Sequence, residues 1–462
     1  MPPKSGTVTG PTRTDGQKSG LAGGATDGMA GRRAAVAILH AVLAGRKPLD
    51  DVLARHAAAG PMASMAQRDR AFVRAIVATT LRRLGQLDHV LGRFLEKPLP
   101  AGRGQLREIL LSAAAQLLFL GTPPHAVVSL AVAQTQQDKH ARRFDKLANA
   151  VLRRVASQGR DIVVGQDAAK LNTPEWLWAS WSSAYGEARA RAIAVSHLSE
   201  AALDISVKSQ PEHWAAVLGG DVLPTGSIRF KPDGRIENLP GYKDGAWWVQ
   251  DAAAALPARL LGTVAGKRIA DLCAAPGGKT AALAACGALV TAVDQSVERI
   301  GRLKQNLARL RLDADIVTAD VTDWQPLELF DAVLLDAPCT ATGTIRRHPD
   351  IPYLKRPSDV ATLAGVQARL LQRALSLVKP GGTVIYSTCS LEAEEGPGQI
   401  AQLLAAMPRI RVDPIAADEI GAEPDWITAQ GFLRTLPCYM VRGAPDNSGL
   451  DGFFAARLIR PV

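Results

Sequence analysis

The sequence predicts a multidomain protein in which an all-α N-terminal domain precedes an α/β domain built on a doubly wound parallel sheet. The chain of 462 residues is too long for one ordinary domain. Apolar residues recur at three- and four-residue spacing from about residue 31 to residue 156, which is typical of helices. From about residue 246 to the end, short apolar runs alternate with amphipathic stretches, as they do in α/β folds.

The helical region is preceded by a segment of different composition. Residues 1–28 are rich in Gly, Thr, Ser and Pro, so they cannot bury enough apolar surface to offset the entropy of ordering. We expect a disordered tail there. The helical domain is expected at 29–160, where runs such as LREILLSAAAQLLFLG are separated by turn-forming sequences such as GRKP and GTPPH.

A small α/β subdomain is expected to connect the two domains, at residues 161–245. The sequence NTPEWLWASWSSAYG predicts the start of a helix, with Asn172 or Thr173 as the cap and Pro174 near the first turn. The runs LDISVKS and GSIRF are typical of short strands.

The C-terminal α/β domain is expected at residues 246–462. Its predicted strands are RIADLCA, LVTAVDQ, ADIVTAD, FDAVLLDAP and GTVIYSTCS, and helical stretches such as SVERIGRLKQNLARLRL separate them. Because open parallel sheets bind ligands at the carboxyl ends of their strands, we expect the functional site at that edge.

The net charge is +10, and residues 29–170 alone carry 22 Lys and Arg against 10 Asp and Glu. Such a local basic field is typical of a polyanion binder, although an ordinary solvated helical surface is equally compatible with it. The sequence has no unbroken apolar run of about 18 residues and no apolar leader, which disfavours a membrane span and secretion. The five cysteines form no C-x-x-C pair and no Cys/His cluster with zinc spacing, so we expect no metal site and a reducing cytoplasm.

The first predicted strand of the α/β domain leads into DLCAAPGGKT at 271–280. Gly277 and Gly278 allow the backbone to approach a ligand, and the following helix N-terminus offers free amides to a carboxylate. Asp294 and Asp320 end the next two strands, where they could hold the ribose hydroxyls and the adenine amino group of a nucleoside. Each acid taken alone is equally typical of a helix cap.

Two cysteines end the last two predicted strands. Asp336 and Cys339 follow the fourth strand, and Cys389 follows the fifth. A cysteine nucleophile reacts as the thiolate, so these settings beside an acid or a Ser/Thr cluster indicate covalent chemistry, whereas a lone buried cysteine usually only packs. The remaining thiols lack this setting and are expected to be structural: Cys273, Cys286 and Cys438.

The α/β domain carries the motifs VQDAAA (249–254), DLCAAPGGKT, DAPCTATG (336–343), YSTCS (386–390) and DGFFAARL (451–458). With these motifs, residues 246–462 resemble the Sun/Nop family of RNA cytosine-5 methyltransferases. The segment IRRHPDI (345–351) is similar to the bacterial ribosomal RNA branch of that family. The helical region resembles NusB, a helical RNA-binding fold, through RDRAFVRAIVATTLRRLGQLD, LLFLGTPPHAVVSLAV and KLANAVLRRV.

The resemblance implies a Rossmann-like, class I S-adenosylmethionine-dependent methyltransferase domain behind a NusB-like RNA-binding domain. It implies S-adenosylmethionine as the cofactor, RNA as the partner, no metal, no membrane, and a monomer. Carried onto this sequence, the cofactor-binding residues are Cys273, Ala274, Ala275, Pro276, Gly277, Gly278, Lys279, Asp294, Asp320 and Asp336.

The resemblance also implies a mechanism. Carbon 5 of cytosine is not nucleophilic enough to accept a methyl group unaided. In the family, the thiolate of the TCS cysteine, here Cys389, adds to carbon 6 and creates an enamine whose carbon 5 attacks the sulfonium methyl. The DAPC aspartate, here Asp336, donates a hydrogen bond at ring N3, which requires its protonation in a closed site. The PC cysteine, here Cys339, helps to remove the carbon 5 proton so that Cys389 can leave.

A cytosine stacked in a helix cannot reach a cysteine in a crevice, so the base must be unpaired or flipped out. Arg346, Arg347 and His348 follow the PC motif, and we expect them to contact the RNA backbone, although an ordinary solvated loop is the alternative. Many family members have an Arg-Val-Asn segment before the catalytic domain, where this chain has DISVK (204–208). This departure leaves open whether an RNA contact is kept there, although Lys208 is nearby.

The NusB-like domain and IRRHPDI favour small-subunit (16S) ribosomal RNA as the substrate. Transfer RNA is the alternative, because relatives with similar catalytic domains use both. A different class of function is an RNA-binding assembly or antitermination factor with a vestigial methyltransferase domain. The presence of Cys339, Cys389 and Asp294 argues against that class.

Overall fold

The computed structural model describes residues 22–100, 102–232, 234–443 and 447–462, and the chain divides into two compact units. The first unit holds the described residues up to 45 together with 50–80 and 91–160. The second holds 46–49, 81–90 and 161–462. The predicted tail at 1–28 lies mostly outside the described residues, but its last part is helical, because α1 (Ala22–Leu43) begins inside it.

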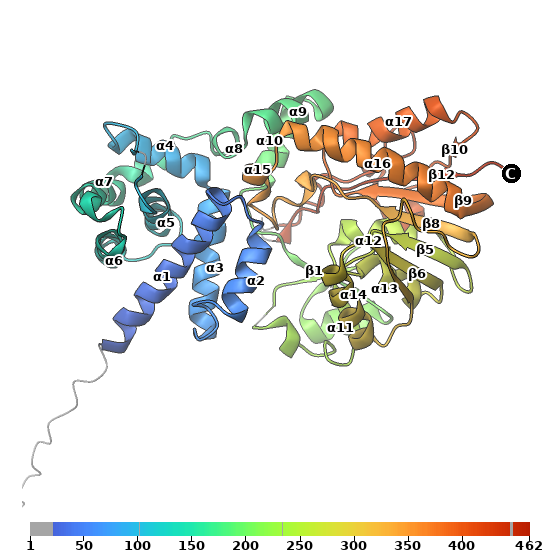
Figure 1. The fold of residues 1–462 in the computed structure, drawn as a ribbon, viewed down its shortest axis with the longest axis horizontal. Coiled ribbons are helices and arrows are strands. Elements are labelled where there is room, and N and C mark those ends of the chain that lie inside the picture. Colours follow the sequence, from blue (N-terminus) through green and yellow to red (C-terminus); the bar gives the residue numbers. More distant parts are fainter. Residues whose placement is uncertain (1–21, 101, 233, 444–446) are drawn as a thin grey trace, which may run out of the picture. The chain divides into compact units, whose positions relative to one another are not determined.

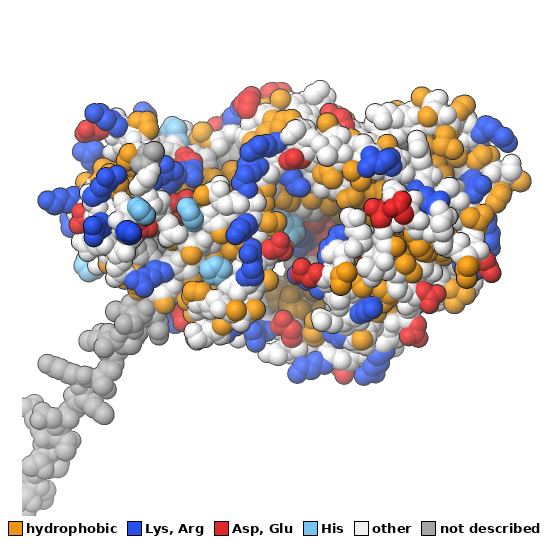
Figure 2. All heavy atoms as spheres, viewed as in Figure 1, with side chains coloured by type: hydrophobic (Ala, Val, Ile, Leu, Met, Phe, Trp, Pro, Cys, Tyr) orange, Lys and Arg blue, Asp and Glu red, His pale blue; other side chains and the backbone are white. Residues whose placement is uncertain are grey.

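The first unit is helical, as predicted. Its helices, some of which extend into the second unit at one end, are α1, α2 (Leu49–Ala58), α3 (Gln67–Arg82), α4 (Leu84–Phe94), α5 (Leu106–Leu118), α6 (Pro124–Gln137) and α7 (Asp145–Val164). Helix α5 is buried along almost its whole length and packs against α1 and α6, because its sequence is apolar on nearly every side. On the face drawn in Figure 2, many Lys and Arg side chains lie over these helices.

The second unit continues with the short helices α8 (Ala168–Leu171), α9 (Glu175–Tyr185) and α10 (Glu187–Ser196). Helix α9 begins after Pro174, so the prediction of Asn172 or Thr173 as its cap is wrong. Asn172 instead ends α8, where its Nδ2 donates to the carbonyl oxygen of Ala168 (2.8 Å) and to Oε1 of Gln86 (3.0 Å).

A small antiparallel sheet follows, in the order β2 (Asp221–Val222), β3 (Ile228–Phe230), β1 (Leu203–Val207) and β4 (Trp247–Val249). Its core contains Ile205, Ile228 and Trp247, and α11 (Pro211–Leu218) contacts β2 and β3. Strand β4 pairs with β1, so the sheet extends beyond the predicted subdomain boundary at residue 245.

The large sheet has the order β10-β12-β9-β8-β5-β6-β7, with β11 paired to β12. Its strands are β5 (Arg268–Leu272), β6 (Leu289–Asp294), β7 (Asp315–Thr318), β8 (Phe330–Asp336), β9 (Val378–Thr388), β10 (Arg411–Val412), β11 (Leu433–Arg434) and β12 (Phe454–Ile459). Strands β5 to β9 are parallel, as predicted, but β12 runs antiparallel to β9, so the sheet is mixed. Strand β12 follows α17 and the short strands β10 and β11, so the alternation of parallel strands and helices did not reveal its antiparallel pairing.

Helices cover both faces of the large sheet (Figure 1). One face packs under α12 (Ala252–Arg259), α13 (Gly278–Ala285) and α14 (Val297–Leu310), and the other under α16 (Pro357–Leu377) and α17 (Pro397–Ala406). Strand β8 alternates between them: Val333 and Leu335 join the core under α16, whereas Ala332 and Leu334 join the core under α12.

The strand order reverses between β5 and β8, because the chain runs outward through β6 and β7 before it returns to the other side of β5. Such a reversal leaves a crevice at the carboxyl ends of the two strands, which is where doubly wound sheets bind ligands. Among the residues that the structure describes, no helix is both long and apolar enough to cross a membrane.

Candidate active site

A pocket of about 380 Å³ lies at the carboxyl ends of strands β5 to β9. Its volume is in the usual range for a small-molecule or cofactor site. The residues predicted from the sequence that line it are Cys273, Ala275, Asp294, Asp320, Asp336, Cys339 and Cys389. The fold therefore brings the acids of three strands and both candidate nucleophiles to one cavity.

The loop after β5 turns sharply into α13. Cys273 and Gly277 have positive φ angles of 60° and 101°, and Gly277 is the N-cap of α13. A Cβ at Gly277 would lie 3.0 Å from Cγ of Leu303, so this loop requires glycine there. Burial, and after it the neighbouring carboxylates, raises the pKa of Cys273 to about 12, which suits a structural thiol and not a nucleophile.

Asp294 and Asp320 line the pocket in different ways. Asp294 is buried at the end of β6, where its Oδ2 accepts from the amide of Ala275 (3.2 Å) and its Oδ1 from the amide of Ser296 and from Arg299 (both 2.9 Å). Asp294 therefore connects the loop after β5 to the N-terminal end of α14. Asp320 is exposed, and hydrogen bonds from the side chain and amide of Thr322 lower its pKa, so it stays ionised at neutral pH.

Asp336, at the end of β8, is held between two donors. Lys279 Nζ lies 2.7 Å from its Oδ2, and the hydroxyl of Ser387 donates to its Oδ1 at 3.1 Å. Lys279 is largely buried, and its ammonium also lies 5.0 Å from the centre of the Phe453 ring. The lysine of DLCAAPGGKT is thus directed at the aspartate of DAPCTATG.

Cys339 and Cys389 lie side by side, with their Sγ atoms 3.4 Å apart, and both thiols are free. The hydrogen bond with Cys389 is the largest cause that raises the pKa of Cys339 well above its usual value. Burial and the charges of Cys389 and Glu395 act in the same direction. Cys339 therefore holds its proton more tightly than an ordinary thiol, which makes it the poorer nucleophile in the resting site.

Sequence reasoning missed two buried acids beside this pocket, Asp271 and Glu395. Asp271 gave a usable signal, because a charged residue within the apolar run RIADLCA is unusual unless it has a role. Glu395 gave no such signal, because LEAEEG contains other glutamates and the sequence alone does not separate them.

Asp271 is buried near Lys279, Asp294 and Asp336, and burial is the main cause that raises its pKa to about 7. Thr280 donates to its Oδ2 at 2.6 Å, while its Oδ1 has no hydrogen-bond partner among the described residues. The folded state therefore binds more protons than the unfolded state between about pH 4 and pH 7, so this group reduces stability as pH rises through that window.

Asp271→Asn removes this titration. We expect the unfolding free energy of the variant relative to the wild type to rise with pH from about 4 to about 7, by about 4 kcal/mol at most. Chemical denaturation of both proteins across this range measures the difference, in which the other titrating groups cancel. A difference that stays constant with pH would contradict the assignment.

Gly343 lies where two catalytic segments cross. Its amide donates to the carbonyl oxygen of Cys389 at 2.9 Å, and its own carbonyl oxygen accepts from the amide of Gly452 at 2.8 Å. A Cβ here would lie 2.0 Å from the carbonyl oxygen of Gly452 and 2.8 Å from that of Cys389. These are backbone atoms, so no side-chain rotation relieves the overlap.

Gly343→Ala is expected to destabilise the protein by about 1–3 kcal/mol and to reduce turnover by displacing Cys389. Gly301→Ala is the matched control, because no atom lies within 4 Å of a Cβ at this position in α14. Helix propensity predicts that the control gains stability, by up to about 1 kcal/mol. Thermal melting and turnover of both variants test this, and equal behaviour of the two would refute it.

The structure gives Arg346 and Arg347 internal roles in place of the predicted RNA contact. Arg346 is buried and donates to the carbonyl oxygen of Ser448 at 2.7 Å. Arg347 pairs with Asp251 (2.5 Å) and Asp451 (3.0 Å). Because both guanidiniums bind internal partners, they are not available to contact phosphates. These internal contacts hold the loop in place. His348 is half-buried, and its RNA contact stays a prediction.

Lys208, near the departure from the family pattern, also has an internal partner. Its ammonium donates to the carbonyl oxygen of Leu310 at the end of α14. The preceding Asp204 forms a buried ion pair with Arg229 at 2.7 Å. The DISVK segment therefore contacts β3 through Asp204 and the end of α14 through Lys208.

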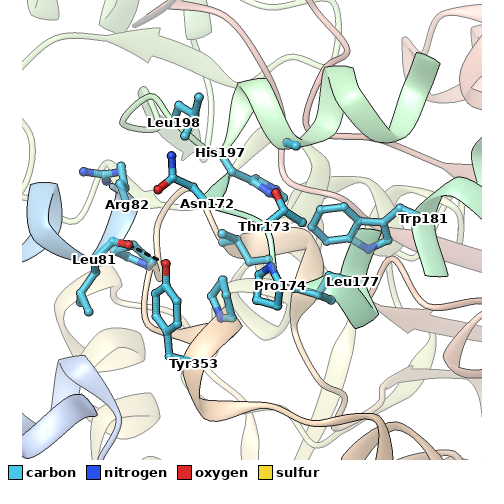
Figure 3. A pocket seen from close by; sticks show the side chains of 14 residues that line it. Leu81, Arg82, Asn172, Thr173, Pro174, Leu177, Trp181, His197, Leu198 and Tyr353 are labelled. Carbon is cyan, nitrogen blue, oxygen red and sulfur yellow. Dashed lines mark hydrogen bonds between the residues drawn. The ribbon is translucent and has the colours of Figure 1, made fainter. Parts of the chain in front are cut away.

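A second cavity, behind the segment that follows Cys339, is not a candidate active site. It has a volume of about 20 Å³, enough for one water molecule. Figure 3 shows His197 and Trp181 on its wall, opposite Leu81 and Tyr353. Burial, with a smaller effect of Arg346, lowers the pKa of His197 to about 3, so the imidazole is neutral.

Comparison with known proteins agrees with this geometry. A family model described as 16S rRNA methyltransferase RsmB/F matches residues 258–459, and the NusB family model matches residues 29–157. Ribosomal RNA small subunit methyltransferase B of Cronobacter sakazakii is 33% identical over 414 residues, covering 86% of this chain and 92% of that protein. The protein of the same name from Pseudomonas putida is 31% identical over 449 residues, covering 93% and 98%.

Among solved structures, a methyltransferase homolog protein from Pyrococcus horikoshii is 26% identical, with a TM-score of 0.51, and covers 61% of this chain and 93% of that chain. The predicted methyltransferase domain and the NusB-like domain are thus both confirmed. Because these relatives are more than 30% identical to it over most of both chains, the chain belongs to the RsmB/F family of 16S rRNA methyltransferases.

Proposed function

We propose that this chain transfers a methyl group from S-adenosylmethionine to carbon 5 of a cytosine in 16S ribosomal RNA. The observation that carries the proposal is the pair Cys339 and Cys389, whose Sγ atoms are 3.4 Å apart in the pocket that Asp294, Asp320 and Asp336 also line. Methylation at carbon 5 needs one nucleophile to activate the ring and one base to restore it, and two adjacent thiols can supply both.

The residues of the pocket fit S-adenosylmethionine. Asp294 and Asp320 offer acceptors for ribose hydroxyls and for the adenine amino group. The Gly277 turn leads into the N-terminus of α13, whose amides suit a carboxylate. When bound, the cofactor supplies a methyl group on a positively charged sulfur. We assign its binding to residues 273–279 with Asp294, Asp320 and Asp336.

In the first stage, the Cys389 thiolate adds to carbon 6 of the cytosine and a carbon–sulfur bond forms. The ring electrons move to N3, where Asp336 delivers a proton, and carbon 5 becomes nucleophilic enough to take the methyl group. Lys279, 2.7 Å from Asp336, is the donor that returns a proton to that carboxylate. This step explains why the lysine is directed at the aspartate.

In the second stage, the carbon 5 proton passes to a Cys339 thiolate, the ring double bond reforms, and the bond from carbon 6 to Cys389 breaks. Cys389 leaves as a thiolate, and the proton on N3 returns to the pair Asp336 and Lys279. The proton that Cys339 gave up before this step goes to water, so one proton is released in each turnover. The high pKa of Cys339 in the free enzyme is due mainly to its hydrogen bond with Cys389. That cause is absent while Cys389 is bonded to the ring, so Cys339 can lose its proton when a base is needed.

Two observations support ribosomal RNA as the substrate. The relatives that match across most of the chain are named ribosomal RNA small subunit methyltransferases. The basic surplus at residues 29–170 falls largely on the NusB-type helices, which suits a polyanion. We extend the proposal to a monomer, because all the catalytic side chains named here lie in one unit of one chain. We also extend it to the cytoplasm, which suits five free cysteines.

The test compares substrates. Wild-type protein is incubated with labelled S-adenosylmethionine and either unmethylated 16S ribosomal RNA or unmodified transfer RNA. We expect label in the ribosomal RNA. Label only in transfer RNA would refute the substrate and keep the chemistry. Tight RNA binding without any label would favour a binding factor, in which case Cys389→Ser would leave the biological activity unchanged.

A further inference from the structure

The segments that follow the two catalytic cysteines share one buried carboxylate, that of Glu395. It lies in a 3₁₀ turn (Ala393–Glu395) after β9 and is fully buried. The amide of Thr340, the residue after Cys339, donates to both of its oxygens, at 3.0 and 3.2 Å, and the Thr340 hydroxyl donates to Oε2. The hydroxyl of Ser390, the residue after Cys389, donates to Oε2 at 2.5 Å.

A third element, α16, also donates to Glu395. Gln367 of α16 donates from Nε2 to Oε1 of Glu395 at 3.0 Å and to the carbonyl oxygen of Pro338 at 2.9 Å. A buried carboxylate is costly unless donors surround it, and here those donors come from the β8 segment, the β9 segment and α16. The carboxylate is therefore the common anchor of the backbone on both sides of the thiol pair.

We propose that Glu395 is a positioning residue that fixes Cys339 against Cys389 and thereby serves the release step rather than the methyl-transfer step. The inference rests on the proposed function. Three of the five hydrogen bonds to its carboxylate come from Thr340 and therefore act on Cys339. Cys389 keeps an independent backbone anchor, because its carbonyl oxygen accepts from Gly343 at 2.9 Å. Loss of the Glu395 carboxylate should therefore loosen Cys339 more than Cys389.

The charge of Glu395 also acts on Cys339. It is one of the groups that raise the pKa of Cys339, after the hydrogen bond with Cys389 and burial. Removal of this charge would let Cys339 lose its proton at lower pH in the free enzyme. The titration of Cys339 therefore reports on the charge of Glu395, and the comparison of methyl transfer with release separates a positioning role from a general structural one.

The test uses Glu395→Gln and the matched control Glu394→Gln, which removes the same charge from the exposed neighbouring residue. In the resting protein, iodoacetamide alkylation of Cys339 is followed against pH by peptide mass spectrometry. We expect the alkylation rate at pH 8 to rise by roughly threefold or more in Glu395→Gln only, because the thiolate fraction changes about tenfold per pKa unit.

The second readout is catalytic. Glu395→Gln should slow turnover by about tenfold or more and accumulate covalent protein–RNA adduct, while the first-turnover rate of methyl transfer changes little. If Glu395→Gln fails to fold, Glu395→Asp replaces it. That variant keeps the charge and shortens the reach, so it should slow release without moving the alkylation profile.

Two results would overturn the inference. One is an alkylation profile and adduct fraction in Glu395→Gln equal to those in Glu394→Gln. The other is an equal loss of methyl transfer and release, which would indicate a general structural role. A shifted alkylation profile in a protein whose wild type forms no 5-methylcytosine would keep Glu395 as the anchor of Cys339 and refute the proposed function instead.

Discussion

Cys389→Ala is expected to abolish the formation of 5-methylcytosine, with a loss of at least about 10⁴-fold in turnover. Without its thiolate, no group in the pocket adds to carbon 6, and carbon 5 stays too weak a nucleophile. Cys339 is a poor substitute, because burial and the charge of Glu395 still raise its pKa in this variant, although its hydrogen bond with Cys389 is lost. Labelled methyl transfer to RNA, followed by nucleoside analysis, measures the effect.

Cys286→Ala is the matched control for this variant, because Cys286 is exposed at the end of α13 and does not line the pocket. It should retain wild-type turnover. Cofactor binding by Cys389→Ala should also be retained, since Cys389 lies outside the β5 loop. Turnover of Cys389→Ala within tenfold of the control would exclude Cys389 as the nucleophile.

Cys339→Ala is expected to trap the reaction halfway. Cys389 can still add to carbon 6 and the methyl group can still be transferred, but the carbon 5 proton has no base to receive it. The carbon–sulfur bond then persists, and turnover falls by about 10²- to 10⁴-fold. A protein–RNA adduct that survives denaturing electrophoresis is the expected product, and it should carry the transferred label.

The double variant Cys339→Ala/Cys389→Ala provides the control for trapping, because no adduct can form without Cys389. An adduct in the double variant would place the covalent bond on another residue. Rapid turnover by Cys339→Ala without any adduct would show that a different base removes the proton, and the 3.4 Å approach of the two thiols would then have no catalytic meaning.

The sequence was sufficient to predict the elements that obey simple periodicity. Apolar runs predicted strands β5 to β9, and the acids and cysteines at their ends were expected at one edge because parallel strands share a direction. That edge holds the pocket. The setting at strand ends beside an acid or a Ser/Thr cluster distinguished Cys339 and Cys389 from Cys286 and Cys438, and the resemblance of DAPCTATG and YSTCS to family motifs then implied their separate roles.

The remaining features depend on long-range pairing. Arg346 and Arg347 look like a basic loop in sequence, but Asp251 and Asp451, which are far away along the chain, neutralise Arg347 in the fold. Glu395 is likewise indistinguishable from its neighbours until Thr340 and Ser390 are placed around it. Strand β12 was missed because it follows α17 and the short strands β10 and β11, and it pairs antiparallel with β9, so it does not continue the alternation of parallel strands and helices.

Identification of the labelled nucleoside tests the central claim most directly. Wild-type protein, labelled S-adenosylmethionine and unmethylated 16S ribosomal RNA are incubated together, and the RNA is digested to nucleosides and separated. The account predicts that the label elutes with 5-methylcytidine. Label in any other nucleoside, such as one methylated on an exocyclic amine or a ribose hydroxyl, would contradict the account, because those positions need no cysteine at carbon 6.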